Sequence, residues 1–383
     1  ITEVTEPEEA NAGAGGIREL QIPGVRVTER LRPPIRLTSE LRGADISQSS
    51  LTYLLDRVSA DRPAQQSKYV GERGAALLQD AQDPEPVMRR VLDVPVARPA
   101  QVEAWAAIGP QTTDAEIDAL HAGGRRIGPL SAASSSRFAG QGRFRASGAF
   151  DRGPRAWVGE WIAGRSAWIA WSTPRPVTLG IIRLKPPAGI VTRLPTSVTV
   201  AAGSRQFGPL PVRSGVVRLP RPVRASRFRL TINDAAFPAS TPGRLRQRRA
   251  VGIGEIEGAG IPSVQTSRSA KLQLACGSAA IDVGGSTVRL GGTVDRVALD
   301  RGRGVLLREC GGRAVLRPPR TEVTGLSAPL RVDAVRLYAA PTADATDKSE
   351  GGGQVTAPGD AGRDGGRTDA AVDVQARAWL SFG

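Results

Sequence analysis

The stretch GAFDRGPRAWVGEWIAGRSAWIAW, residues 148–171, contains four of the six tryptophans of the chain. The whole chain has only three Tyr and seven Phe, so this is a strong local concentration of aromatic side chains. Two explanations compete: the indoles stack on a ligand, or they fill a small apolar core. Successive side chains of a strand point to opposite faces, so Trp168 and Trp171 in AWIAW cannot both face the same core.

The segments around this stretch predict antiparallel β-structure. Between residues 130 and 264, short apolar runs alternate with Gly, Pro and Ser at intervals of about ten to twenty residues, which is typical of a sandwich or barrel. Residues 265–341 repeat the pattern on a smaller scale. We therefore expect a mainly β chain with tandem antiparallel β-sandwiches, one over 130–264 and a smaller one over 265–341.

Residues 28–129 read as a mixed α/β region. The apolar residues of 51–58 recur at helical spacing and predict a helix. Residues 87–108 alternate as an extended segment does. The run TTDAEIDALHAG, 112–123, predicts a short helix with Thr113 as N-cap, Glu116 three residues later and Gly123 at its end.

The two ends indicate a piece of a longer protein. The chain starts at Ile1 and stops at Gly383 within a strand-like pattern. GIREL at 16–20 is echoed by GIGEI at 252–256, so residues 1–27 are expected to be the terminal strand of a preceding β-sandwich. Residues 342–371 have too few apolar side chains to order themselves and predict a disordered linker, and 372–383 predict the start of a further β domain.

The net charge of +15 has two explanations. A basic surface attracts polyanions, whereas 52 basic residues with only four lysines also follow from GC-rich coding, which implies no partner. The arginines read as scattered apart from GRLRQRR at 243–249, and aromatic residues do not interleave with them. We therefore predict no nucleic-acid partner, and keep anionic lipid as an alternative partner for one set of side chains: Arg244, Arg246, Arg248 and Arg249.

Cys276 and Cys310, the only two cysteines, are 34 residues apart in one β-patterned stretch. A metal site would need more ligands, and the single His121 lies far away in sequence. A disulfide is the simpler prediction, and it places the segment outside the cytosol. No Ser/His or Cys/His arrangement is available, so the segment offers no catalytic site.

The order of motifs in residues 131–264 resembles a discoidin, or factor V/VIII type C, domain with the galactose-binding-like fold. Ala-Ser and Ser-Ser near residue 133 are followed by Ala149-x-Asp151 before a Trp, then Trp-Ile, Pro, Ile-x-Leu and a closing Ile253-x-Glu-Ile strand. In this family the positions of Trp157 and Trp168 are normally core. Because alternation lets only one of Trp168 and Trp171 face inward, and Trp171 matches an aliphatic core position of the family, we assign Trp157 and Trp171 to the core. Trp168 then lies at an end of the sandwich or under a loop, and Trp161 remains for stacking on a sugar.

A wider resemblance covers most of the chain. LTYLLDR, DPEPVMRR, DAEIDAL, the discoidin-like part and LREC…VDAVRLY follow in the order seen in the extracytoplasmic region of membrane α-(1→3)-arabinofuranosyltransferases that build actinobacterial cell-wall arabinan. This implies an accessory, carbohydrate-binding region attached to a plasma-membrane glycosyltransferase. The alternative is a scaffold that packs on the membrane domain of the same chain and binds no sugar.

The discoidin resemblance also implies site residues. Sugar binders of this type use loops at one end of the sandwich, where polar side chains bind hydroxyl groups beside an aromatic ring. Besides Trp161, the expected contributors are Arg137, Arg143, Arg145, Asn233 and Asp234. Many such modules hold a structural Ca²⁺, for which Asp151 and Glu255 match two ligand positions; the second Asp of the usual loop is replaced near Arg152.

Overall fold

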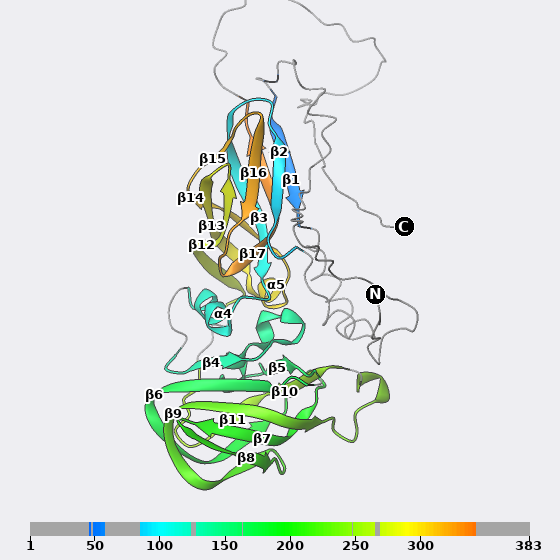
Figure 1. Cartoon of the computed structure of the whole chain (residues 1–383), viewed down its shortest axis with the longest axis vertical. Helices are drawn as coiled ribbons and strands as arrows, with labels where there is room; N and C mark the ends of the chain where they lie inside the picture. Colours follow the sequence, from blue (N-terminus) through cyan, green and yellow to red (C-terminus); the bar gives the residue numbers. More distant parts are fainter. Residues whose placement is uncertain are drawn as a thin grey trace, which may run out of the picture.

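The computed structural model describes residues 46, 49–57, 85–123, 128–162, 164–246, 248–264 and 269–341. The expected terminal strand of 1–27, the linker of 342–371 and the strand start of 372–383 lie outside these residues. The described chain is mainly β with antiparallel sheets, which confirms the predicted fold class. It forms two units stacked along the long axis in Figure 1.

The first unit, called here the disulfide unit, combines described residues of 46–123 with those of 269–341. Its sheet has the order β1-β17-β3-β14-β13-β12-β16-β2, with β15 also paired to β3. Its elements are β1 (Leu51–Asp56), β2 (Arg89–Asp93), β3 (Arg98–Ile108), α4 (Asp114–His121), β12 (Lys271–Val283), β13 (Ser286–Asp295), α5 (Arg296–Asp300), β14 (Val305–Gly311), β15 (Ala314–Leu316), β16 (Arg320–Gly325) and β17 (Leu330–Ala339).

The disulfide unit differs from the expected arrangement, because residues of 28–129 and 265–341 share one sheet and one core. The central strand β3 pairs with both β14 and β17. Its inward residues Val102, Ala104 and Ala106 are almost fully buried, as their alternation predicts. They require strands from beyond residue 269 to cover them, so the smaller sandwich cannot be assembled from 265–341 alone.

The predicted helix around 51–58 is wrong. Residues Leu51–Asp56 form β1, which pairs with β17 along its whole length from Leu51↔Ala339 to Asp56↔Ala334. Leu55 is buried and its neighbours are partly exposed, so sheet pairing overrides the helical spacing of the leucines. The helix predicted near 113–123 is confirmed: Thr113 caps α4, and its hydroxyl accepts from Glu116 N at 3.2 Å.

The second unit, residues 128–264, is called here the tryptophan unit and is inserted between α4 and β12. Its larger sheet has the order β11-β6-β9-β7-β8, with β4 also paired to β6, and β5 pairs with β10. Its elements are β4 (Ser131–Ser134), η1 (Phe138–Gly140), η2 (Gly142–Phe144), η3 (Ala146–Phe150), β5 (Trp157–Glu160), β6 (Ala167–Lys185), β7 (Leu194–Ala202), β8 (Arg205–Pro211), β9 (Val216–Ala236), η4 (Gly243–Leu245), β10 (Ala250–Ile253) and β11 (Glu255–Glu257).

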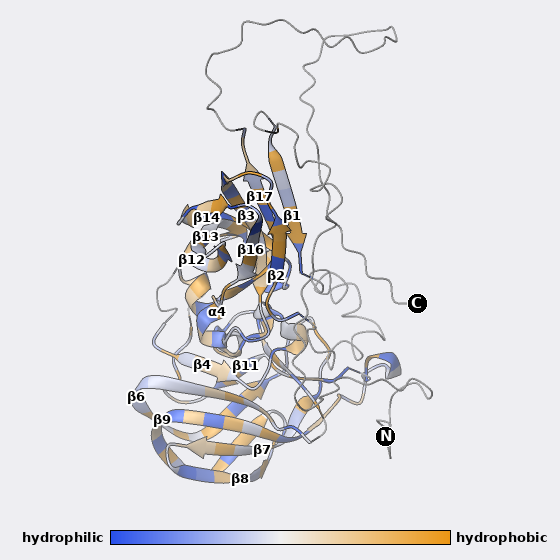
Figure 2. Ribbon diagram, turned by 45° about the horizontal axis from the view of Figure 1, so that its top comes forward, coloured by the Kyte–Doolittle hydropathy of each residue, from blue (hydrophilic) through white to orange (hydrophobic). Residues whose placement is uncertain are grey.

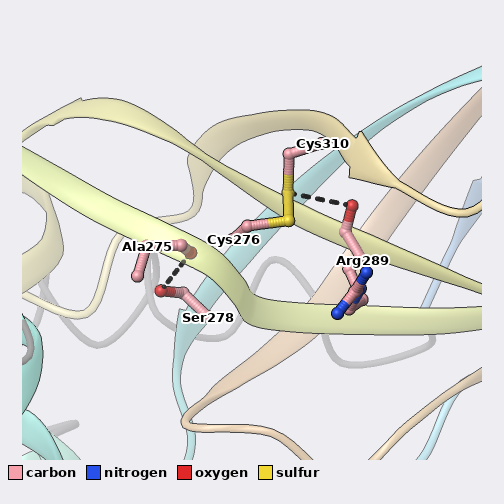
Figure 3. The surroundings of a disulfide bond; sticks show 5 residues. All are labelled: Ala275, Cys276, Ser278, Arg289 and Cys310. Carbon is pink, nitrogen blue, oxygen red and sulfur yellow. Dashed lines mark hydrogen bonds between the residues drawn. A yellow bond between two sulfur atoms is a disulfide. The ribbon is translucent and has the colours of Figure 1, made fainter.

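The predicted disulfide is present. Cys276 on β12 and Cys310 on β14 are joined across β13, with their Cα atoms 5.7 Å apart (Figure 3). Gly291 of β13 lies beneath the bulge of β12, where an added Cβ would come within 2.8 Å of Ala275 O. The glycine therefore lets β12 approach β13 closely enough for the bridge.

None of the helices within the described ranges is both long and apolar enough to cross a bilayer.

Candidate functional site

Two tryptophans of the opening stretch belong to the core of the tryptophan unit. Trp157 is 0% exposed and Trp171 is 2% exposed. The Trp171 ring stacks on Phe228 with centroids 5.3 Å apart and tilts against Phe150 at 5.5 Å. The inward assignment of both indoles is confirmed.

Trp168 lies on the outer face of the large sheet and remains partly exposed. The guanidinium of Arg229, on the neighbouring strand β9, lies 3.8 Å from the centroid of its ring. This distance is that of a cation–π contact on a ring that water still reaches. The sequence predicted that Trp168 lies at an end of the sandwich or under a loop, whereas it lies on β6 opposite Thr231. No local pattern shows the arginine above it, because that contact depends on the register of β6 against β9.

Polar and small side chains surround this stack on the same face. Thr231 of β9 lies opposite Trp168 on β6 and opposite Thr199 on β7. Asn233 Nδ2 donates to Thr199 Oγ1 at 2.9 Å, and the same hydroxyl lies 3.3 Å from Asn233 Oδ1, so the amide is held against Thr199. We call Trp168, Arg229, Thr231, Thr199 and Asn233 the platform.

The sheet surface beside the platform carries small side chains, because alanines occupy the positions next to Arg229. Ala170 and Ala201 lie opposite Arg229 on the two neighbouring strands. Methyl groups at these positions leave space above the sheet that larger side chains would fill. The platform thus brings together one aromatic ring, one guanidinium that covers part of it, one amide and two hydroxyls, on residues that are exposed or partly exposed.

Asn233 and Asp234 lie at the end of β9 and not in a loop, as the sequence had suggested. Both are exposed. Asp234 Oδ2 accepts from Thr196 Oγ1 at 3.2 Å, and Oδ1 accepts from Ala235 N at 2.8 Å. Ala167 pairs with Ile232, so the loop that carries Trp161 leaves the sheet beside this end of β9.

Trp161 packs partly buried against the core of the tryptophan unit, and its main-chain N–H donates to Arg249 O at 2.9 Å. Trp161 and Trp168 are both partly exposed. Its role in sugar binding stays a prediction.

Arg137 and Arg145 lie in the seam between the two units, where α4 meets β4 and η3. Arg145 is 1% exposed; its Nε donates to Asp118 Oδ1 at 2.7 Å and its Nη1 to Asp300 Oδ1 at 3.2 Å. Arg137 Nη1 donates to Asp114 Oδ1 at 3.1 Å. Because both guanidinium groups pair with carboxylates inside the protein, we no longer count Arg137 and Arg145 among the candidate sugar-binding residues.

Arg143 also lies near the seam. Its guanidinium is 4.4 Å from the centroid of the Phe144 ring. Burial, with the nearby charge of Arg301, lowers the pKa of Arg143. The residue is far along the chain from the platform strands and is not brought to them by any contact described above.

The carboxylates and the histidine of the seam have shifted pKa values. Burial raises the pKa of Asp118, although Arg145 opposes this. Burial lowers the pKa of His121, whose Nε2 lies 2.9 Å from Asp300 Oδ1. These groups hold two units together, and His121 at 8% exposure is not accessible to a substrate.

The two positions that match calcium ligands do not fit that ion. Asp151 Oδ2 pairs with Arg155 Nε at 2.9 Å, and Oδ1 accepts from Gly153 N at 2.8 Å. Glu255 Oε2 accepts from Arg152 N at 3.0 Å. In the described part of the chain no three His, Cys, Asp or Glu side chains gather to hold a metal. The guanidinium of Arg155 supplies the positive charge at this loop.

The arginines of 243–249 are largely occupied by the loop that carries them. Arg246 donates from Nε to Thr241 O at 3.0 Å and from Nη2 to Ala239 O at 2.9 Å. Arg248 Nη1 donates to Val191 O at 3.3 Å. Two of the four arginines are thus held by main-chain carbonyls, Arg246 within its own loop and Arg248 at Val191.

An open pocket of about 660 Å³ is lined in part by Cys276 and Cys310 of the disulfide. Its charged lining residues are already engaged: Arg308 pairs with Glu103 at 3.1 Å, and Glu309 accepts from Val102 N at 3.2 Å. The rest of the lining is mostly small residues. This pocket offers fewer free polar groups than the platform.

No protein-family model and no curated protein matches the chain. Among solved structures, the chain is similar to the arabinofuranosyltransferase AftD from Mycobacteria, with a TM-score of 0.43 and 19% identity over 70% of this chain and 21% of that one. It thus spans about a fifth of that protein.

A second group of similar structures matches a smaller share of the chain. They include the family 32 carbohydrate-binding module of C. perfringens NanJ in complex with galactose, with a TM-score of 0.25 and 13% identity over 38% of this chain and 96% of that one. They also include an F5/8 type C domain from Bacteroides fragilis, with a TM-score of 0.25 and 15% identity over 36% and 92%. The chain resembles both kinds of protein.

Proposed function

We propose that this chain is a non-catalytic accessory region that binds carbohydrate on the platform of the tryptophan unit. The observation that carries the proposal is the partly exposed Trp168 ring under the Arg229 guanidinium, beside an Asn233 amide held in place by Thr199. No other surface described above combines an accessible ring with oriented hydrogen-bonding groups.

The chemistry of the platform suits a sugar. A sugar ring can pack its C–H face on the part of the indole that Arg229 leaves uncovered, and its hydroxyl groups take hydrogen bonds from guanidinium and amide groups. A furanose has a smaller flat face than a pyranose, so polar groups must contribute more of its binding. Arg229, Asn233 and the two threonines supply those groups next to a single ring.

The finer assignment follows from the order of motifs in the sequence. It points to arabinan as the glycan, to a membrane-attached glycosyltransferase as the whole protein, and to the extracytoplasmic side as its location. The Cys276–Cys310 disulfide supports the last point, since disulfides persist in oxidising compartments.

A scaffold that binds no sugar is the second candidate function. It is favoured by the seam, in which a fully buried Arg145 connects α4, α5 and the tryptophan unit. Such a connection holds two units in one orientation, as a spacer on a membrane domain would need.

Titration of the whole chain with a glycan panel separates the two functions. We expect saturable binding of arabinan fragments and weaker binding of galactan fragments. Absence of binding to every glycan, with the fold intact by circular dichroism, would leave the scaffold as the function.

A further inference from the structure

The positive charge of the chain is concentrated in the strands of the tryptophan unit. Residues 165–236 contain eleven Arg and one Lys but a single acidic residue, Asp234, so they carry +11 of the net +15. This concentration differs from the expectation that the arginines are scattered along the chain. Figure 2 shows hydrophilic segments along β9 and β8 that correspond to them.

Four of these arginines form a regular row on β9: Arg218, Arg221, Arg224 and Arg227 recur every three residues. In a regular strand an interval of three would put neighbours on opposite faces. Here the register between β6 and β9 shifts twice, between Ser172 and Val177 and between Leu179 and Ile181. All four side chains are exposed as a result, and we call them the arginine row.

The row has no internal counter-charge. Within the described ranges, no carboxylate forms an ion pair with any of its four members, and Asp234 is hydrogen-bonded to Thr196. Like charges in a line repel one another, and exposed cationic rows attract anionic partners. The row thus favours a partner with repeated negative charge.

The neighbours that pair with the row on β6 are neutral: Thr178 and Ser172 lie opposite Arg224 and Arg227, and Ile181 lies opposite Arg218. Arg175, in the β6 segment between Ser172 and Val177, adds a further exposed positive charge beside the row. The spacing of the row is uneven, because the step of five residues from Arg218 to Val223 on β9 spans a step of only two residues from Ile181 to Leu179 on β6. A flexible polymer chain can adapt to such uneven spacing along one strand.

We propose that the arginine row binds an acidic polysaccharide chain lying along β9. Arg229 of the platform continues the row, so one glycan strand can pass from the platform onto it. This inference rests on the proposed function and adds that the glycan, or a segment attached to it, carries carboxylate, sulfate or phosphate groups. Guanidinium groups bind such anions through paired N–H donors.

The test compares two double variants of the whole chain with equal loss of charge. Polygalacturonate serves as the acidic probe and an arabinan fragment as the neutral one. The row variant is Arg221→Ala with Arg224→Ala, and the control is Arg303→Ala with Arg313→Ala, two exposed arginines of the disulfide unit. We expect the row variant to bind polygalacturonate about tenfold more weakly and with a shallower salt dependence, by about two charges.

Three results would overturn the inference: equal losses in both variants, tighter binding to anionic lipid vesicles than to polygalacturonate, or tighter binding to duplex DNA. If arabinan binds and polygalacturonate does not, only the proposal that the arginine row binds an acidic polysaccharide is refuted. If neither glycan binds, the proposed function is refuted as well.

Discussion

At the scale of single residues, the tryptophans divide between stability and binding. Trp157 is fully buried in the core, so Trp157→Ala should lower the free energy of unfolding by about 3–5 kcal/mol. Trp168→Ala, on the outer face, should cost far less. Chemical denaturation of both variants measures the difference, and equal losses would show that the division is wrong.

Glu255 should give the tryptophan unit a pH dependence. Burial raises its pKa from about 4.5 to about 7, with the charge of Asp151 adding to the effect. A raised pKa contributes stability below the ordinary value that is lost as pH rises through about 7. Thermal unfolding between pH 5 and 8 should therefore show a stability that falls with pH. Glu255→Gln should flatten this slope, and an unchanged slope would assign it to another group.

At the scale of elements, Arg145 connects α4 and α5 to the tryptophan unit across the seam. Replacing Arg145 by Met removes the cation shared by the buried Asp118 and Asp300, leaving Ser147 and His121 as their described partners, and should cost about 3–5 kcal/mol. Arg183→Met, at an exposed position of β6, is the matched control and should be nearly neutral. Urea denaturation of the two variants measures this, and a loss below 1 kcal/mol for Arg145→Met would contradict the described network.

Local patterns predicted most of the elements. The strands of the tryptophan unit, the capping box of α4 and the Cys276–Cys310 pair follow from alternation, capping chemistry and cysteine count. β1 was missed because the spacing of its leucines also suits a helix, and only its pairing with β17 decides between the two. No local signal in the sequence shows that Arg137 and Arg145 reach Asp114 and Asp118 from another unit.

At the scale of the whole molecule, the disulfide unit is built from two distant parts of the chain around an insertion. A fragment of residues 269–341 lacks β1, β2 and β3 and leaves the core positions of β14 and β17 uncovered. We expect it to show no cooperative thermal transition. A fragment of residues 128–264 retains its own core and should unfold cooperatively. Cooperative unfolding of 269–341 alone would contradict the topology.

The topology and the site were the hardest features to derive from the sequence. Two β-patterned stretches in succession predict two domains in tandem. No local sequence pattern shows that the strand at 98–108 pairs with a strand beyond residue 300. The platform joins β6, β9 and β7, so it depends on register between three strands. Of its members, only Asn233 had been singled out as a binding residue, and the segment that carries Trp168 had been noted for its composition.

Isothermal titration calorimetry tests the central claim most directly. An arabinan fragment is titrated into the whole chain and into its Trp168→Ala variant. The account predicts saturable binding by the unaltered chain and at least a tenfold weaker affinity in the variant, about 1.4 kcal/mol, with the melting temperature nearly unchanged. Equal affinity in the two proteins would show that sugar binds elsewhere, and no binding by either would remove carbohydrate recognition from the platform.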